Sequence, residues 1–266
     1  MLSEPICLRV KGPFACFTRP EFHVERVSYP IITPSAARGI LEAILMKPVE
    51  KPEDAKRGNK LGFRWRILRL AILREGVLVP ILRNELGYGT HQAYGNARGY
   101  DIMDERAQRH SLILKDVEYL IEAVIQVINT GHRDLPDGAG RRPSEEFLAR
   151  NKYHQMFLRR AVAGQCYYQP FLGCREFSVC EWELVPKPPQ AIPEAPAQKD
   201  FGVVFRDFDF SPVWNHWGHA AGQKRPGNGW NQPGKRPEQL PPLKAVARSG
   251  WITAAEIKGG KVEDLI

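Results

Sequence analysis

The chain has 266 residues, 43% of them hydrophobic, which is enough for one substantial core with a smaller second unit and too little for several large domains. No stretch approaches the roughly 20 apolar residues needed to cross a bilayer, and residues 1–10 lack the hydrophobic block of a cleaved signal. The sequence therefore predicts a cytoplasmic protein with no membrane partner. Lys and Arg number 38 against 30 Asp and Glu, a net charge of +8, which favours a polyanionic partner without distinguishing RNA, DNA and anionic surfaces.

The five cysteines are an odd set, and none of them are spaced as the paired knuckles that hold zinc. We interpret them as reduced structural thiols and predict no metal site. They are Cys7, Cys16, Cys166, Cys174 and Cys180.

The first elements are a strand and a helix. Pro5 to Gly12 alternates apolar and polar side chains, as in a half-buried strand, and a hairpin is expected between Phe14 and Tyr29. Thr33, Pro34 and Ser35 then open a helix that is expected to end at Pro48.

Two strand pairs are predicted next. The run from Phe63 to Leu82 alternates Arg with apolar residues and predicts two strands joined at Glu75-Gly76, with one arginine-rich face. After a glycine-containing surface loop, a second pair is expected over residues 106–129, joined at Lys115-Asp116.

The rest of the chain is expected to hold a second helix, two strands and a tail. Pro143 and Ser144 open the helix, which continues to Val162, and strands are expected over residues 174–184 and 201–210. The domains predicted are residues 1–184, a linker over residues 185–200 that carries five prolines, and a small β-unit with an irregular tail over residues 201–266.

The element order up to Leu184 is strand, helix, strand, strand, helix, strand. This predicts an α+β protein whose N-terminal domain is ferredoxin-like, the RRM-type βαββαβ plan, with inserted hairpins. An open sheet face of that kind suits single-stranded RNA.

Three stretches resemble one known family. They are F-A-C-F-T (14–18) followed by V-E-R-V-S-Y (24–29), then P-S-A-A-R-G-I-L-E-A-I-L-M-K-P (34–48), and finally K-Y-H-Q-M-F-L-R-R-A leading into G-Q-C-Y-Y-Q-P-F-L-G-C-R-E-F within residues 152–177. They are similar to the RAMP-superfamily Cas five protein of the subtype I-C, or Dvulg, CRISPR system. With weaker matches, the resemblance spans residues 1 to about 210.

The resemblance implies a biochemical role. A member of this family is expected to cut CRISPR repeat RNA without a metal and then to stay on the RNA's 5′ handle inside an effector complex. The partners implied are CRISPR RNA, the other type I-C effector subunits and, through the complex, target DNA.

Metal-free RNA cleavage needs a base for the 2′-hydroxyl, donors for the phosphate and an acid for the leaving oxygen. The family's proposed actors are a lysine-histidine pair at the start of the second helix and an aromatic or histidine near the end of the first. Lys152 matches the lysine. The next position is Tyr153, the histidine follows at His154, and the first-helix position is Leu45, which cannot move a proton.

The geometry of residues 152–154 has two alternatives. In a regular helix Lys152 and His154 point nearly opposite ways, and His154 joins an apolar stripe with Phe147 and Leu158. If Asn151 caps a fresh helix instead, Lys152 and His154 lie in its first turn, where free amides favour a phosphate.

The remaining candidates are RNA contacts, for which ordinary solvated charge and core packing are the alternatives. They are Arg38, Lys47, Arg159, Arg160, Arg175, Tyr167, Tyr168 and Phe171.

The tail carries four tryptophans, which are expected to dock on RNA or a neighbouring subunit: Trp214, Trp217, Trp230 and Trp251. His216 and His219 lack a third ligand, so they predict no metal site. Gly87, Gly89 and Gly95 lack the strand-to-helix setting of a nucleotide-binding turn, so no cofactor is predicted.

Three functions therefore compete. The chain can be a nuclease that uses Lys152 with His154 or Tyr153, a non-catalytic subunit that holds the 5′ handle, or a basic DNA-binding protein outside the CRISPR system.

Overall fold

A computed structural model of the chain describes residues 1–22, 24–47, 62–86, 106–128, 144, 146–209, 238–259 and 261–264. The helical elements are α1 (Pro34–Ile44), the π-helical η2 (Phe147–Tyr153) and α3 (His154–Val162), which continues η2 without a break. The strands up to α3 are β1 (Ile6–Ala15), β2 (Arg26–Val27), β3 (Phe63–Arg74), β4 (Val77–Leu86) and β5 (Arg106–Val127). The later strands are β6 (Glu181–Leu184), β7 (Gln198–Val204), β8 (Phe208–Asp209), β9 (Glu238–Gln239), β10 (Leu243–Arg248), β11 (Trp251–Thr253), β12 (Ala255–Lys258) and β13 (Lys261–Asp264).

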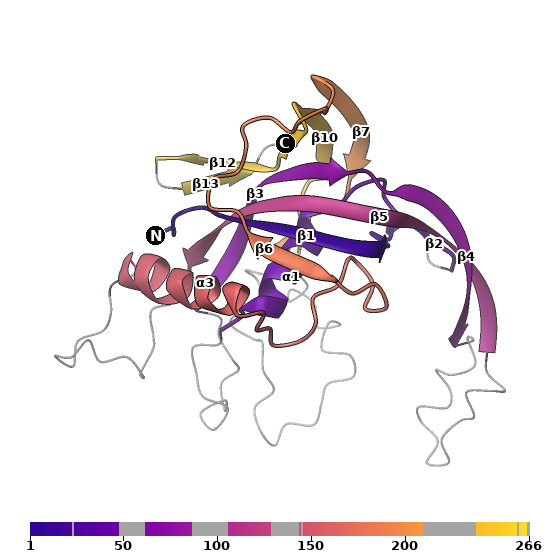
Figure 1. Cartoon of the computed structure of the whole chain (residues 1–266), viewed down its shortest axis with the longest axis horizontal. Helices are drawn as coiled ribbons and strands as arrows, with labels where there is room; N and C mark the ends of the chain where they lie inside the picture. Colours follow the sequence, from indigo (N-terminus) through magenta and orange to yellow (C-terminus); the bar gives the residue numbers. More distant parts are fainter. Residues whose placement is uncertain are drawn as a thin grey trace, which may run out of the picture.

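The chain is a mixed α and β protein dominated by one sheet. The strands run β6-β1-β5-β3-β11-β10-β7, and β2 and β4 pair with β5 beside this path. Figure 1 shows α1 and α3 on one side of the sheet and the last strands of the chain on the other. The predicted combination of helices with a sheet is therefore confirmed.

The side chains of β5 alternate between the two faces of the sheet. Tyr119, Ile121 and Ala123 point into the main core together with α1 and α3, whereas Leu120 and Val124 belong to smaller clusters on the opposite face. This period of two places one face of the strand under the helices. Because the opposite face is also covered by apolar clusters, residues 117–127 are strongly apolar although only one face meets the helices.

The predicted start of α1 is confirmed. The Thr33 hydroxyl accepts a hydrogen bond from the Ala36 amide at 3.2 Å, and Pro34 occupies the first turn. The helix ends at Ile44 rather than Pro48, because Leu45 is already extended. In that conformation the Leu45 carbonyl accepts a hydrogen bond from Trp65 Nε1 at 3.1 Å.

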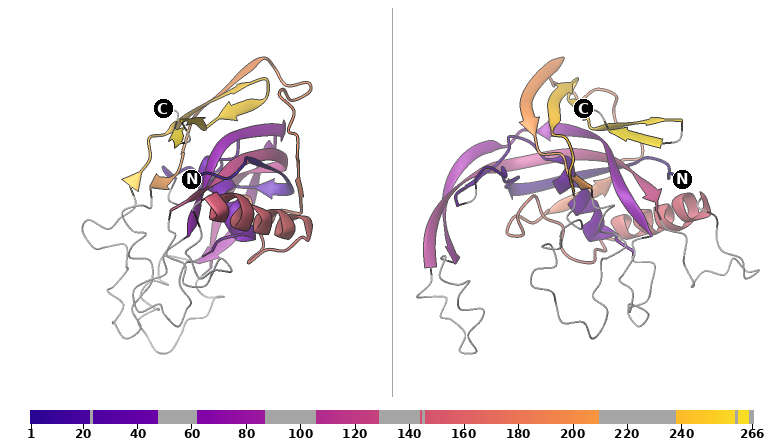
Figure 2. Two further views of the ribbon diagram at one scale, coloured as in Figure 1. Left: turned by 90° about the vertical axis from the view of Figure 1, so that its left-hand side faces the viewer. Right: turned by 180° about the vertical axis from the view of Figure 1, so that it is seen from behind.

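The predicted break between two strands at Glu75-Gly76 is confirmed, but β3 and β4 do not form a hairpin with each other, and the predicted strand pair across Lys115-Asp116 is wrong. β3 and β4 both pair antiparallel with β5, in one register on either side of the break, and β5 runs unbroken from Arg106 to Val127. Gly76 therefore stands opposite Asp116, whose φ of 60° bends the long strand. Figure 2 shows β4 and the adjoining part of β5 curving away from the rest of the sheet.

The bend leaves no room for a side chain at position 76, which gives a testable prediction. A Cβ added to Gly76 would lie 2.6 Å from Val117 Cγ1 and 3.0 Å from the Lys115 carbonyl oxygen. We expect Gly76→Ala to lower the free energy of unfolding by about 1–3 kcal/mol. In the matched control, Gly39→Ala, the new methyl meets nothing within 4 Å inside α1, so stability should rise by about 1 kcal/mol. Urea unfolding of both variants checks the pair, and equal effects at the two glycines would contradict this account.

The prediction of an irregular tail is also wrong for its final part. β10 and β11 pair, and β11 extends the sheet by pairing with β3. Trp251, expected to dock on RNA or another subunit, is buried against Cys7, Leu120 and Ile192. The other three tryptophans, both tail histidines and the glycines at 87, 89 and 95 lie outside the described residues.

The predicted linker crosses the face of the sheet opposite the helices. The Ile192 amide donates to the Ser249 carbonyl at 2.9 Å, and Trp251 Nε1 donates to the Pro189 carbonyl at 3.1 Å. β7 begins at Gln198, inside the range assigned to the linker. The domain boundaries at 184 and 200 stay predictions.

Other element boundaries also differ from expectation. The strand expected over residues 174–184 is confined to β6, because residues 171–180 form turns, with the Phe177 amide bonded to the Cys174 carbonyl at 3.0 Å. The hairpin expected between Phe14 and Tyr29 is reduced to a single bridge between Thr18 and Ser28. The strand expected over residues 201–210 is divided into β7 and β8.

The described part of the chain has neither a membrane-spanning helix nor a cluster of metal ligands. No helix there is long and apolar enough to span a membrane. The same residues hold no group of three or more His, Cys, Asp or Glu side chains placed to bind a metal ion.

Candidate functional site

Several predicted RNA contacts meet at the C-terminal end of α1. Arg160 Nη1 donates to the Ile44 carbonyl at 2.9 Å, and the Tyr167 amide donates to the Ala43 carbonyl at 2.7 Å. These donors satisfy carbonyls that the helix end would leave unpaired, and the Arg160 charge suits the negative end of the helix dipole. Tyr167 is 78% exposed, so its ring lies where a base could stack on it.

Lys47 and Lys152 are connected to this region through a buried aromatic pair. The Lys47 carbonyl accepts the Gly62 amide at 3.1 Å, and the next ring, that of Phe63, lies 4.6 Å from the ring of Tyr153. Lys152 directly precedes Tyr153 in the chain, and its Nζ lies 5.7 Å from the centroid of the Tyr153 ring. We call Lys47, Arg160 and Tyr167, together with the two further cations of η2 and α3, Lys152 and Arg159, the α1-end surface.

Tyr153 is part of the core and not of the surface. Its exposed fraction is 0%, and burial raises the pKa of its phenol above the ordinary value. A neutral phenol under the helix cannot exchange protons with an RNA on the surface in this conformation. The ring therefore positions η2 against β3.

His154 lies on another side of the helix from Lys152. It lines a cavity of about 560 Å³ together with Glu4, Leu158 and Val162. The spacing of four residues between His154, Leu158 and Val162 puts them on one stripe of α3, whereas Lys152 is two residues away from His154 and so points elsewhere. Burial lowers the pKa of His154 while the nearby Glu4 carboxylate acts to raise it.

The suggestion that Asn151 starts a new helix is wrong. Residues 147–153 form a π-helix whose backbone runs directly into α3, and Asn151 lies within it. Lys152 and His154 therefore have no free helix amides beside them. The first alternative, with the two side chains pointing apart, is the one observed.

Leu45 is also buried, with 1% of its surface exposed. The position that carries an aromatic or histidine in the resemblance thus points into the main core here. No proton-transfer group is available from that position.

Arg38 is held by two carboxylates. Its Nε and Nη2 donate to the two carboxylate oxygens of Asp207 at 2.6 and 3.0 Å, and its Nη1 donates to Glu42 at 2.7 Å. Burial raises the pKa of Glu42, although Arg38 opposes the shift. A guanidinium engaged in this way would have to leave both partners to reach RNA, while Arg159 and Arg175 are exposed.

The arginine-rich face predicted for β3 exists, but carboxylates from other strands neutralise it. Arg69 bonds to Glu122 at 2.7 Å, and Arg66 bonds to Asp264 at 2.7 Å. On β1, Arg9 contacts both Glu118 and Glu183. This face is therefore a network of ion pairs rather than a free cationic surface.

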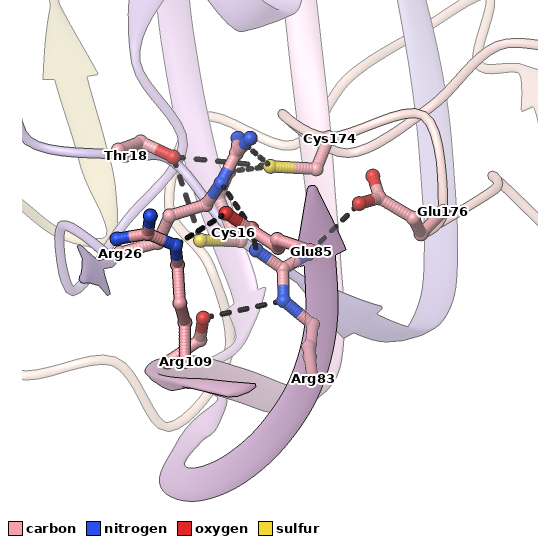
Figure 3. Close-up of polar contacts among 9 residues, drawn as sticks. Cys16, Thr18, Arg26, Arg83, Glu85, Arg109, Cys174 and Glu176 are labelled. Carbon is pink, nitrogen blue, oxygen red and sulfur yellow. Dashed lines mark hydrogen bonds and ion pairs between the residues drawn. The ribbon is translucent and has the colours of Figure 1, made fainter. Parts of the chain in front are cut away.

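The sequence did not reveal a second cluster, on the half of the bent β4–β5 ribbon that is farther from Gly76 (Figure 3). Glu85 accepts from Arg83 at 2.7 Å and from Arg26 at 3.3 Å, and Arg109 Nε lies 3.7 Å from it. Arg26 Nη1 also reaches Cys174 Sγ at 3.3 Å. The alternation within β4 puts Arg83 and Glu85 on one face, but β2 and the segment around Cys174 come from distant parts of the chain.

Comparison with known proteins places the chain in a family. The model of the CRISPR-associated protein (Cas_Cas5), in its Cas5d form, matches residues 6–234. The chain is 35% identical to the CRISPR pre-crRNA endoribonuclease Cas5d of Thermus thermophilus over 97% of its own length and 93% of that protein. It is 36% identical to the protein of the same name from Mannheimia succiniciproducens, over 79% of this chain and 87% of that one.

A solved structure shows the same fold. The crystal structure of a CRISPR-associated protein aligns with 95% of this chain and 92% of its own, at a TM-score of 0.52 and 20% identity. The family model covers the segments that build the α1-end surface. The chain belongs to the Cas5d family of CRISPR-associated proteins.

Proposed function

We propose that this protein binds the repeat-derived part of CRISPR RNA and cuts it out of the precursor transcript without a metal. The observation that carries the proposal is the match over 97% of the chain to a relative named a CRISPR pre-crRNA endoribonuclease. The net charge of +8 and the cations at the end of α1 fit an RNA partner. After cleavage the protein stays on the 5′ handle as a cytoplasmic subunit of the type I-C effector, with target DNA bound through the complex.

The proposed chemistry uses Lys152 and His154 separately. Lys152 stabilises the negative charge that develops on the phosphate when the 2′-hydroxyl attacks it. His154, neutral because its pKa is lowered, is the candidate to accept the 2′-hydroxyl proton. Since the two side chains lie on different sides of the helix, the RNA strand would have to bend around α3, or the helix start would have to shift on binding.

A second candidate function is supported by the same geometry. Leu45 and Tyr153 are both buried, so two of the expected proton-transfer positions are closed. A subunit that only holds the 5′ handle needs the cations of the α1-end surface and none of the acid-base groups.

The deciding experiment is incubation of the purified full chain with its repeat RNA in EDTA. Cleavage at one position supports the nuclease, because chelation leaves only protein groups to catalyse it. Tight repeat-specific binding without cleavage supports the structural subunit. Equal affinity for repeat RNA, random RNA and duplex DNA would contradict both.

The lowered pKa of His154 gives a prediction about pH. A histidine whose pKa is below its ordinary value stays neutral further into the acidic range, so it keeps its capacity to accept a proton there. Cleavage by the native protein should therefore fall only below the pH at which a free histidine protonates. In His154→Gln this acidic limb should be lost and the rate should drop. A pH-rate profile of the two proteins checks this, and an unchanged profile in the variant would remove His154 from the chemistry.

We also propose that the sheet core is ferredoxin-like. The supporting observations are the spatial order β6-β1-β5-β3 and antiparallel pairing between each of these neighbours. With α1 between β1 and β3, and α3 between β5 and β6, the chain order matches the βαββαβ plan.

A further inference from the structure

Two cysteines far apart in sequence come together beside the cluster around Glu85 (Figure 3). The hydroxyl oxygen of Thr18 lies 3.6 Å from Cys16 Sγ and 3.8 Å from Cys174 Sγ. The Cys174 thiol also reaches the Cys16 carbonyl oxygen, at 3.6 Å. Both thiols are therefore grouped around the same side chain.

The backbones that carry these cysteines are in direct contact as well. The Cys16 amide donates to the Leu172 carbonyl at 3.0 Å. Gly173, with φ of +87°, lies so close that an added Cβ would be 2.0 Å from the Cys16 carbonyl oxygen. Contact between two backbones on this scale is what a disulfide between their side chains requires.

The surroundings of Cys174 favour the thiolate form. Arg26 Nη1 points at Cys174 Sγ from 3.3 Å. The hydrogen bond with Cys16 is the largest cause that lowers the pKa of Cys174, and Arg26 lowers it further against the effect of burial. The Cys16 thiol shows the opposite shift, because it shares that hydrogen bond and is buried. The position of Arg26 beside Cys174 thus favours that sulfur as the nucleophile, with Cys16 as its proton-bearing partner.

The other cysteines lack this combination. Cys7 is buried like Cys16 and Cys174, but burial and then the nearby Glu122 carboxylate raise its pKa to about 12. Cys180 is exposed, and its thiol contacts the Ser178 carbonyl rather than a cation. If exposure alone decided reactivity, Cys180 would react first. If a neighbouring cation decides it, Cys174 reacts first.

We propose that Cys16 and Cys174 are a redox-active pair that hydroperoxides convert to an intramolecular disulfide. The Cys174 thiol first gives its proton to the solvent; its thiolate then attacks the distal oxygen of the peroxide, the O–O bond breaks, and the departing oxygen takes up a proton from the solvent to leave as an alcohol, or as water when the oxidant is hydrogen peroxide. Cys16 then attacks Cys174 Sγ, the S–S bond forms, the S–O bond breaks, and the hydroxyl leaves with the Cys16 proton as water. In sum, two thiols and one hydroperoxide give one disulfide, one alcohol and one water.

The disulfide would fix the segment 171–178 to the end of β1. This segment carries Arg175, a predicted RNA contact, one residue from Cys174. Oxidation would also remove the negative sulfur that Arg26 faces, so that its guanidinium would keep the hydrogen bond to Glu85 but lose the one to Cys174.

The test treats the reduced full chain with one equivalent of hydrogen peroxide and maps disulfides by mass spectrometry after non-reducing digestion. We expect a Cys16–Cys174 link as the main product, unchanged in the control variant Cys180→Ser. In Cys16→Ser, Cys174 should accumulate as a sulfenic acid that a cyclic 1,3-dione traps. Arg26→Gln keeps both thiols and should slow disulfide formation by about threefold or more.

The disulfide map and the rates distinguish this pair from unspecific oxidation. A link that forms in the native chain, is absent in Cys174→Ser and is slowed in Arg26→Gln supports the pair. Oxidation confined to Cys180 or Cys166, or an equal rate in Arg26→Gln, overturns it. The Arg26 variant leaves both sulfurs in place, so the proposal stays testable even if a cysteine variant fails to fold.

Discussion

Replacing Tyr153 with alanine is expected to lower the free energy of unfolding by about 3–5 kcal/mol, the usual cost of removing a fully buried aromatic side chain. The ring has an exposed fraction of 0% and packs 4.6 Å from the Phe63 ring. Its loss would leave a cavity between η2 and β3. Because domains are stable by only about 5–15 kcal/mol, the variant should lose a large part of its resistance to urea.

Tyr153→Phe separates packing from chemistry. The variant keeps the ring and removes the hydroxyl, so stability should stay within about 1 kcal/mol of the native protein. If Tyr153 acts only through packing, repeat-RNA cleavage by this variant should be unchanged. A loss of cleavage with normal stability would show that the phenol takes part in the reaction and that our placement of it in the core is incomplete.

Lys152→Ala is expected to reduce cleavage of repeat RNA by about 10²- to 10⁴-fold, the usual effect of losing one positioned catalytic group. Affinity should fall only slightly, because phosphate contacts are distributed over many cations and each adds a modest share. Single-turnover rates at saturating protein separate the two effects.

The matched control for Lys152 is Lys11→Ala. Lys11 is also a half-exposed lysine, but it lies on β1 and pairs with Glu181 at 3.3 Å, away from the α1-end surface. Its removal should change neither cleavage nor binding measurably. Equal losses in the two variants would mean that general charge, and not the position of Lys152, accounts for the activity.

Short sequence patterns predicted the elements whose structure depends mainly on neighbouring residues in the chain. Thr33 and Pro34 carry the start of α1 in their own chemistry, and the alternation of β1 can be recognised from eight residues. Glu75-Gly76 shows the limit of such signals, because the same pair suits a tight turn and a bend. Pairing with β5 decides between them, and β5 lies some forty residues later in the chain.

The sequence predicted which residues could belong to the site, but not which side chains they would contact. The sequence identified Arg160 and Tyr167, which meet at the end of α1, but it also assigned Arg38 to RNA. Of the two carboxylates that bind Arg38, Glu42 lies at the local i,i+4 spacing, but Asp207 is 169 residues away, and no local pattern connects it to Arg38. The same holds for Cys16 and Cys174, which only the packing of residues 171–178 against β1 brings together.

The unbroken course of β5 also has a mechanical consequence. A load applied near Arg106 would act along a ladder of hydrogen bonds that continues into the strand at the centre of the core. Many such bonds would share it at once, so the ribbon should transmit force as a stiff lever rather than swing on a hinge. A force applied to the end of the ribbon near Arg106 would therefore reach the part of the sheet that packs beneath α1 and α3.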